Sequence, residues 1–162
     1  MRPRLFIFCG IPGSGKTSIA SLVTKAMGDA IHIQTDGVRG MLARPTFAGK
    51  ESQFVYEASF ALAREALKSG YSVVIDGTFM REDYRKKARL ALRKHYSRAD
   101  TVFVSCGLDT ALRRNSSRDA TVPPEKVRGM FLRFEVPRRA LKVDSSRGSP
   151  ESAARRVVRA LL

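Results

Sequence analysis

An eight-residue segment near the amino terminus has the residue types and spacing of a phosphate-binding loop. It runs Gly10-Ile11-Pro12-Gly13-Ser14-Gly15-Lys16-Thr17 and fits the pattern G-x-x-x-x-G-K-[ST] at every fixed position. In this pattern, free backbone N–H groups and the positive end of a helix converge on phosphate oxygens. Lys16 would reach the β- and γ-phosphates, and the Thr17 hydroxyl would bind Mg²⁺. The segment therefore predicts a binding site for a nucleoside triphosphate.

The sequence on either side of this loop agrees with that prediction. The run Leu5-Phe6-Ile7-Phe8-Cys9 ahead of it is apolar throughout, which is typical of a buried parallel strand. The segment 16–23 behind it is typical of the first turns of a helix. This context disfavours the alternative of a chance match in a turn. The residues that we expect to bind the nucleotide are Gly10, Pro12, Gly13, Ser14, Gly15, Lys16, Thr17, Ser18 and, from a later segment, Arg114.

A carboxylate follows the second predicted strand, where it would lie beside this loop. Asp36 follows the strand 30–34 and therefore emerges at the carboxyl edge of the sheet. Arg39 lies one helical turn further on the same face. Asp36 would accept a proton from an acceptor hydroxyl, while Arg39 would anchor an acceptor phosphate or steady the carboxylate. The alternative is a helix N-cap at Asp36 and a surface arginine.

A second carboxylate ends the third predicted strand. The apolar run Val73-Val74-Ile75 is followed by Asp76, which is the Walker B arrangement. Asp76 would hold Mg²⁺ through a water, together with Thr17, or would orient the acceptor. The alternative is that Asp76 only caps the turn formed with Gly77-Thr78.

An arginine-rich segment at about 108–137 is expected to form a lid over the bound phosphates. Between 113 and 142 there are nine basic residues against three acidic ones, and Pro123-Pro124 divides the segment into two short helices. Guanidinium groups that arrive when a lid closes stabilise charge on the transferring phosphoryl group. The alternative is that Arg113, Arg114 and Arg118 are exposed helix residues.

Apolar runs alternate with helical patterns, which predicts a single α/β domain over residues 1–162. Its architecture would be three-layered, with a parallel five-stranded sheet and helices on both faces. The strands are predicted near 5–9, 30–34, 72–76, 101–105 and 140–144. The helices are predicted near 15–27, 37–43, 51–69, 81–95, 108–117, 124–134 and 150–162.

Two of the predicted helices have a clear amphipathic pattern. In 81–95 the expected buried stripe is Tyr84, Ala88, Ala91, Leu92 and His95, and the remaining residues, Arg85 among them, form a basic face. In 150–162 the stripe is Ala154, Val157, Val158 and Leu161. We expect each basic face to be primarily a solvated surface and only secondarily a candidate contact for nucleic acid.

The overall charge is strongly positive. Thirty Lys and Arg residues against fifteen Asp and Glu residues give a net charge of +15. Such a surface attracts polyanions, nucleic acid above all; the alternative is that the basicity only reflects composition. The longest apolar stretch near the amino terminus is too short to span a membrane, and no small-residue cleavage site follows. We therefore expect a cytoplasmic protein without a membrane partner.

Four groups of residues, taken in order, resemble the motifs of the polynucleotide 5′-hydroxyl kinases. They resemble equally those of the archaeal and eukaryotic kinases that phosphorylate seryl-tRNA, and more loosely those of zeta-toxin-type and adenylylsulfate kinases. The groups are Gly10–Thr17, Thr35-Asp36-Gly37-Val38-Arg39, Val73-Val74-Ile75-Asp76-Gly77-Thr78, and Arg113-Arg114-Asn115-Ser116-Ser117-Arg118 followed by Val122-Pro123 and Arg128-Gly129-Met130.

The resemblance implies a fold of the adenylate-kinase type, with strand order 2-3-1-4-5. It also implies Asp36 as general base, Arg39 on the acceptor phosphate, and Arg114 and Arg118 on ATP and the transition state. Polynucleotide kinases tend to have the strand-end aspartate one position later, where this chain has Gly77. Seryl-tRNA kinases carry an additional C-terminal region beyond the part that corresponds to this chain. We therefore expect any tRNA to be held by the basic surface or by a partner.

Together these features predict an ATP- and Mg²⁺-dependent kinase that phosphorylates a hydroxyl, preferably on a nucleic acid. Asn-Lys-x-Asp, the guanine motif, and Leu-Ser-Gly-Gly-Gln, a transporter motif, are both missing from the sequence. Two alternatives are a kinase for a sugar, antibiotic, nucleotide or adenylylsulfate, and a nucleic-acid-binding ATPase that transfers nothing. The expected catalytic residues are Lys16, Asp36, Arg39, Arg114 and Arg118.

Overall fold

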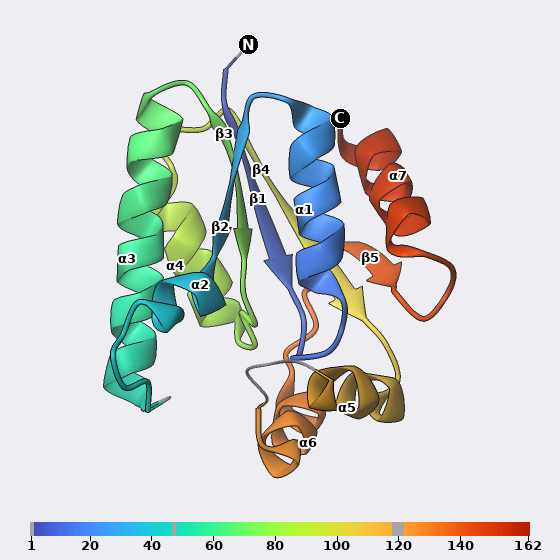
Figure 1. Ribbon diagram of the computed structural model, residues 1–162. Coiled ribbons are helices and arrows are strands. Elements are labelled where there is room, and N and C mark those ends of the chain that lie inside the picture. Colours follow the sequence, from blue (N-terminus) through green and yellow to red (C-terminus); the bar gives the residue numbers. More distant parts are fainter. Residues whose placement is uncertain (1, 47, 118–121) are drawn as a thin grey trace.

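The computed structural model describes residues 2–46, 48–117 and 122–162, and these ranges contain one parallel five-stranded sheet. Its strands are β1 (Arg4–Cys9), β2 (Ala30–Gln34), β3 (Ser72–Asp76), β4 (Arg98–Ser105) and β5 (Leu141–Asp144). They lie in the order β2-β3-β1-β4-β5 (Figure 1), which confirms the predicted α/β fold. Because β1 is central, the loop that follows it opens in the middle of the sheet's carboxyl edge.

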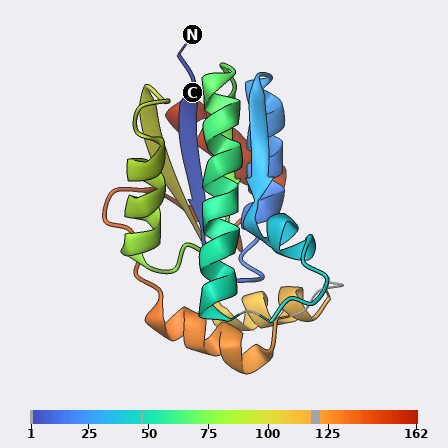
Figure 2. The same ribbon diagram turned by 90° about the vertical axis from the view of Figure 1, so that its left-hand side faces the viewer.

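Helices cover both faces of this sheet (Figures 1 and 2). The described residues form the helices α1 (Lys16–Met27), α2 (Thr35–Gly40), α3 (Gly49–Lys68), α4 (Glu82–Leu92), α5 (Leu108–Ser116), α6 (Pro124–Arg133) and α7 (Pro150–Leu161). Of these, α1, α3, α4 and α7 pack on the sheet. On β1, Leu5 and Ile7 pack under α3 and α4, whereas Phe6 and Phe8 pack under α1 and α7. Alternate side chains of a strand point to opposite faces, so a central strand buried on both faces is apolar throughout.

Element boundaries differ from the sequence prediction by up to three residues, most clearly at α2, α4 and β4. Helix α2 begins at Thr35 rather than near 37, and α4 ends at Leu92 rather than near 95. Strand β4 begins at Arg98 rather than near 101, because its first residues pair in register with β1, where Arg4 lies opposite Arg98. Arg4 also forms an ion pair with Asp100 at 2.8 Å. These polar residues belong to a strand only through that pairing, which an apolar pattern does not reveal.

Helices α5 and α6 lie beyond the carboxyl ends of the strands (Figure 1). They pack on the phosphate loop through a small apolar cluster in which Ile11, Ala111 and Val127 are buried. The buried side chain of Asn115 joins the two helices. Its Nδ2 donates to the Val122 carbonyl at 2.7 Å, and its Oδ1 accepts from the Val122 N–H at 3.2 Å. The α5–α6 pair therefore stands directly over the predicted phosphate site.

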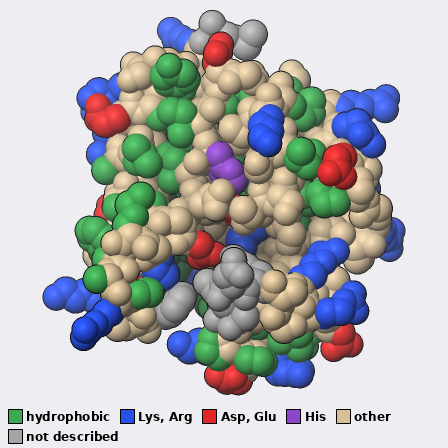
Figure 3. Space-filling model, viewed as in Figure 1, with side chains coloured by type: hydrophobic (Ala, Val, Ile, Leu, Met, Phe, Trp, Pro, Cys, Tyr) green, Lys and Arg blue, Asp and Glu red, His purple; other side chains and the backbone are tan. Residues whose placement is uncertain are grey.

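The surface carries many more cations than anions. In the view of Figure 3, Lys and Arg side chains project mainly from the rim of the face that is seen, among a smaller number of acidic ones. Many of them have acidic neighbours; Lys87, for example, pairs with Glu57 of α3. Within the described ranges, no helix combines the length and the apolar composition that crossing a bilayer requires.

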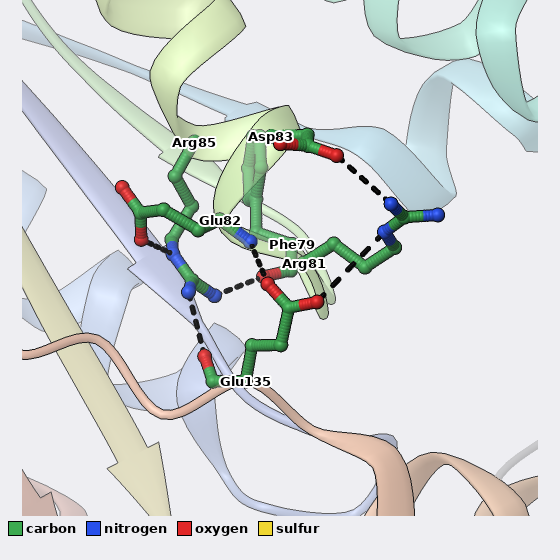
Figure 4. A network of polar contacts seen from close by, with 6 residues as sticks. All are labelled: Phe79, Arg81, Glu82, Asp83, Arg85 and Glu135. Carbon is green, nitrogen blue, oxygen red and sulfur yellow. Dashed lines mark hydrogen bonds and ion pairs between the residues drawn. The ribbon is translucent and has the colours of Figure 1, made fainter.

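One arginine that the helical pattern assigned to the solvated face of α4 is instead buried. The Arg85 side chain is 1% exposed, and its guanidinium donates to the carbonyls of Phe79 and Glu135, at 2.5 and 2.6 Å. Its Nε also donates to Glu82 at 2.8 Å (Figure 4). The prediction was wrong here because the segment after α6 crosses α4 at this position and supplies the carbonyl that Arg85 needs.

The contacts around Arg85 join the end of α6 to the loop after β3. The Glu135 N–H donates to the Met80 carbonyl at 3.0 Å, and the Glu135 carboxylate accepts from the Glu82 N–H at 2.7 Å. Phe79, in that loop, has a φ of 43°, which is strained for a residue with a side chain. We refer to residues 79–82 and 134–135 as the clasp. The clasp thereby holds the loop after β3 against the end of the α5–α6 pair.

Replacing Arg85 should therefore destabilise the fold. In Arg85→Met the carbonyls of Phe79 and Glu135 lose their donors, so we expect the free energy of unfolding in urea to fall by about 2–4 kcal/mol. Arg89→Met is the matched control, because Arg89 pairs with the same Glu82 but is 32% exposed. We expect that control to cost less than about 1 kcal/mol. Equal losses in the two variants would show that the two carbonyls are satisfied by water.

Candidate active site

The phosphate loop has the backbone shape that its glycines predict. It connects β1 to α1, and Gly13 and Gly15 have φ values of 79° and 84°, in the left-handed region. A cavity of about 390 Å³ opens over the loop. Its lining consists of Gly13, Gly15, Lys16, Thr17, Ser18 and Arg114. The Lys16 side chain is nearly buried, so its charge is directed into this cavity rather than into bulk water.

Gly13 cannot carry a side chain for a second reason. A Cβ at this position would overlap the Ala111 carbonyl oxygen of α5. The loop and α5 are therefore in backbone contact, which no other residue type at position 13 permits. Gly10 is similar, because a Cβ there would overlap the Val104 carbonyl oxygen of β4.

Arg114 is held at the same cavity by the segment after β5. Its Nη1 donates to Ser145 Oγ at 2.9 Å, and its Nη2 donates to the Ser145 carbonyl at 3.1 Å. Ser145 Oγ in turn donates to the Ser14 carbonyl of the loop at 2.6 Å. Ser145 thus connects the loop, α5 and the last strand. Arg118, the other arginine expected on the phosphates, lies outside the described residues.

Asp76 lies beside the loop at the end of β3 and is 3% exposed. Burial raises the pKa of Asp76, but the imidazole of His32, the Lys16 charge and the Thr17 hydroxyl lower it by more, so its pKa lies below the ordinary value. His32 Nε2 lies 3.6 Å from Asp76 Oδ2. Within the described residues, Asp76 Oδ1 has no hydrogen-bond partner. A buried, ionised oxygen of this kind fits an ion or a water that an ion holds.

Asp36 and Arg39 line a second cavity of about 390 Å³. Asp36 is the second residue of α2, and the N-cap position is Gln34, so Asp36 does not act as an N-cap. Arg39 forms an ion pair with Glu51 of α3, and its Nη2 donates to Ser52 at 3.2 Å. These contacts favour the role of steadying the region around Asp36 over that of a freely available phosphate ligand.

The two cavities meet at the phosphate loop. Pro12 lines the cavity of Asp36, and the next residue, Gly13, lines the cavity of Lys16. The structure therefore places Asp36 and the phosphate cradle on neighbouring sides of one loop. This is the arrangement that a carboxylate needs if it is to act on a group beside a bound γ-phosphate.

Several residues of the second cavity were not predicted from the sequence as site residues. Tyr56 of α3 and Tyr84 of α4 stack with ring centroids 4.8 Å apart, and the Tyr56 hydroxyl accepts from the Phe79 N–H at 3.2 Å. Burial raises the pKa of Tyr56 to about 12. The clasp contributes Met80, and α6 contributes three further side chains to the lining: Lys126, Met130 and Arg133. These residues come from four separate segments, so no short spacing connects them.

The backbone contact at Gly13 gives a direct test of the site. We expect Gly13→Ala to lower the affinity for a fluorescent ATP analogue at least about tenfold, because the added methyl group pushes the loop away from α5. Gly28→Ala is the matched control: it has a similar φ of 76°, and its Cβ would meet no atom within 4 Å. It should cost only backbone strain, about 1 kcal/mol in stability. Unchanged nucleotide affinity in Gly13→Ala would contradict this account of the loop.

Several kinases are similar to this chain in sequence or in structure. The chain is 26% identical over 137 residues to L-seryl-tRNA(Sec) kinase of Methanococcus maripaludis, covering 82% of this chain and 53% of that protein. It thus spans about half the length of this relative. The APS kinase CysC of Mycobacterium tuberculosis, solved with AMPPNP and APS, superposes with a TM-score of 0.79 at 21% identity, covering 99% of this chain and 98% of that one.

A sugar kinase of Janibacter sp. HTCC2649 superposes with a TM-score of 0.75 at 19% identity, covering 97% of this chain and 93% of that one. Because the sequence identities to the solved structures are this low, the similarity shows that this chain and those proteins have the same fold. The AAA domain family model AAA_33 matches residues 5–137, which include the phosphate loop, Asp36, Asp76 and both helices of the α5–α6 pair. The chain therefore belongs to this AAA domain family and has the P-loop kinase fold.

Proposed function

We propose that this protein is an ATP- and Mg²⁺-dependent kinase that transfers the γ-phosphoryl group to a hydroxyl of a nucleic acid. The acceptor is a polynucleotide 5′-end or a hydroxyl carried by tRNA. The observation that carries the proposal is the pair of cavities on either side of one loop, one holding Lys16 and Arg114 and the other Asp36. Absence of the Asn-Lys-x-Asp motif from the sequence favours ATP over GTP.

Each residue would have a defined task in the transfer. Lys16 and Arg114 hold the phosphate oxygens, and Arg118 is proposed to add charge there from the predicted lid segment. Thr17 and Asp76 would hold Mg²⁺, which supplies positive charge to the β- and γ-phosphate oxygens when it is bound. Asp36 orients the acceptor hydroxyl and takes its proton as the new P–O bond forms and the bond to ADP breaks.

Three observations support a nucleic-acid acceptor. The net charge of +15 favours a polyanion, and a seryl-tRNA kinase is among the similar proteins. The cationic side chains Lys126 and Arg133 also line the cavity of Asp36, which we call the acceptor cavity. A small-molecule acceptor is the second candidate, because the cavity of about 390 Å³ is of small-ligand size and kinases for APS and a sugar share the fold.

An acceptor panel tests the proposal. The protein is incubated with γ-labelled ATP and 5′-hydroxyl RNA, 5′-hydroxyl DNA, aminoacylated tRNA, sugars or adenylylsulfate. We expect label on a nucleic acid, with apparent affinity falling steeply as salt rises. Label on a metabolite alone, without salt dependence, would replace the proposal by the second candidate. Label that appears only as inorganic phosphate would indicate an ATPase that transfers nothing.

Replacing Asp36 tests its role as base. We expect Asp36→Asn to lower kcat at least about 100-fold, because the amide cannot accept the acceptor's proton, and to leave ATP affinity nearly unchanged. Asp29→Asn, at the amino end of β2, makes the same change away from the site and should keep full activity. Retained turnover in Asp36→Asn would remove this residue as the base.

A further inference from the structure

A hollow of about 1020 Å³, larger than either cavity of the site, lies beside β4. Strand β5 pairs with β4 only from Val102 to Ser105, so Arg98–Thr101 has no strand on that side among the described residues. Three consecutive residues of this stretch, Ala99, Asp100 and Thr101, line the hollow. Since consecutive side chains point to opposite faces, the hollow must reach the strand's edge. We call it the β4 groove; α4 forms one wall and residues 135–141 form another.

The acidic side chains of this groove are already neutralised. Glu82 pairs with Arg85 and Arg89. Asp100 pairs with Arg4 and Arg98, both at 2.8 Å. Glu135 accepts from the Glu82 N–H and lies 3.9 Å from Arg81. The groove therefore has no uncompensated carboxylate in the described part of the chain.

Two arginines of the same groove have no such partner. Arg138 and Arg139 are consecutive, exposed residues in the segment between α6 and β5, and neither makes an ion pair within the described residues. Arg89 lies on the opposite wall, on α4. The groove thus has an excess of guanidinium groups. Guanidinium groups bind phosphate oxygens in a forked, two-bond geometry.

The clasp contributes residues to both the β4 groove and the cavity of Asp36. Met80 and Arg133 line the acceptor cavity, whereas Glu82 and Glu135 line the groove. The Glu135 N–H donates to the Met80 carbonyl at 3.0 Å, so the two hollows lie on either side of one hydrogen-bonded pair of segments. A polymer that has its end at Asp36 and passes this pair of segments would enter the β4 groove.

We propose that the β4 groove binds the phosphodiester backbone of the acceptor nucleic acid, through Arg138 and Arg139, while its terminal unit lies at Asp36. This inference rests on the proposed function, because it takes the acceptor to be a nucleic acid. The acceptor cavity has room for a terminal unit only, and the groove supplies the cations that the rest of the strand requires. Backbone contacts of this kind position a substrate without reading its sequence.

The test compares two charge-matched double variants. Arg138→Ala/Arg139→Ala removes the groove cations, and Arg155→Ala/Arg156→Ala removes two exposed cations of α7 that do not line the groove. Binding of labelled single-stranded RNA and DNA of roughly 20 nucleotides is measured by fluorescence anisotropy without ATP, over a range of salt. We expect the groove variant to lose about tenfold or more in affinity and its salt slope to fall by about 1.4, twice the value for one phosphate contact.

Kinetics supply the second measurement. In the groove variant, KM for the long 5′-hydroxyl strand should rise while kcat stays unchanged, and KM for a 5′-hydroxyl dinucleotide, which ends within the cavity, should not change. The α7 variant should resemble the wild type in both. Comparing the loss of affinity for RNA with the loss of affinity for DNA then shows whether the groove accepts an RNA or a DNA backbone.

The outcomes separate this inference from the proposed function. If a nucleic acid is phosphorylated but the two double variants behave alike, the groove is excluded and the kinase assignment stands. If nucleic acids bind through Arg138 and Arg139 but only a metabolite is phosphorylated, the groove stands and the acceptor assignment fails. Absence of nucleic-acid binding in the wild type overturns the inference. So does stronger binding of an acidic peptide than of RNA or DNA, which would assign the open β4 edge to a protein strand.

Discussion

The close backbone contact between the phosphate loop and α5 is the constraint on which the site depends. Gly13 lies against the Ala111 carbonyl with no room for a side chain. This contact places Arg114, one helical turn later on α5, at the mouth of the phosphate cavity. Ser145 then ties Arg114 to the loop by hydrogen bonds to both. Loop, helix and last strand therefore hold their positions before any phosphate binds, which reduces the cost of ordering them on binding.

The acceptor side is held by a different set of contacts. The buried guanidinium of Arg85 joins the strained loop after β3 to the end of α6, and Tyr56 supports the same loop at Phe79. Arg39 is fixed by Glu51 and Ser52 of α3. Asp36 thus lies between walls that are tied down on both sides. A carboxylate that must meet a hydroxyl within hydrogen-bond reach gains from walls of this kind.

The cations that hold positions in the site and the exposed cations that attract a polyanion lie in different parts of the molecule. Two arginines of the site have assigned contacts: Arg114 at the phosphate cavity with Ser145, and Arg39 at the cavity of Asp36 with Glu51. The guanidinium groups of Arg138 and Arg139, which make no ion pair with any residue that the structure describes, lie outside the site, in the β4 groove. Cations without partners attract a polyanion over distances of about the Debye length, roughly 8–10 Å at ordinary salt. Cations that are held by contacts instead fix the relative positions of the segments that they join.

Local patterns along the chain were enough to predict the phosphate loop and the places of Asp36 and Asp76 at the carboxyl ends of their strands, and the resemblance supplied the strand order. These features are local: a glycine pattern, an apolar run and the residue that follows it are all within a few positions of one another. The burial of Arg85, the pairing of Arg39 with Glu51 and the cavity that Tyr56 and Arg133 share with Asp36 could not be predicted without the folded chain. Each of these depends on carbonyls, carboxylates or rings supplied by segments far away in the chain. A helical pattern shows which face of an element a residue occupies, but the partner that makes a polar group buried or exposed is chosen by the packing of elements.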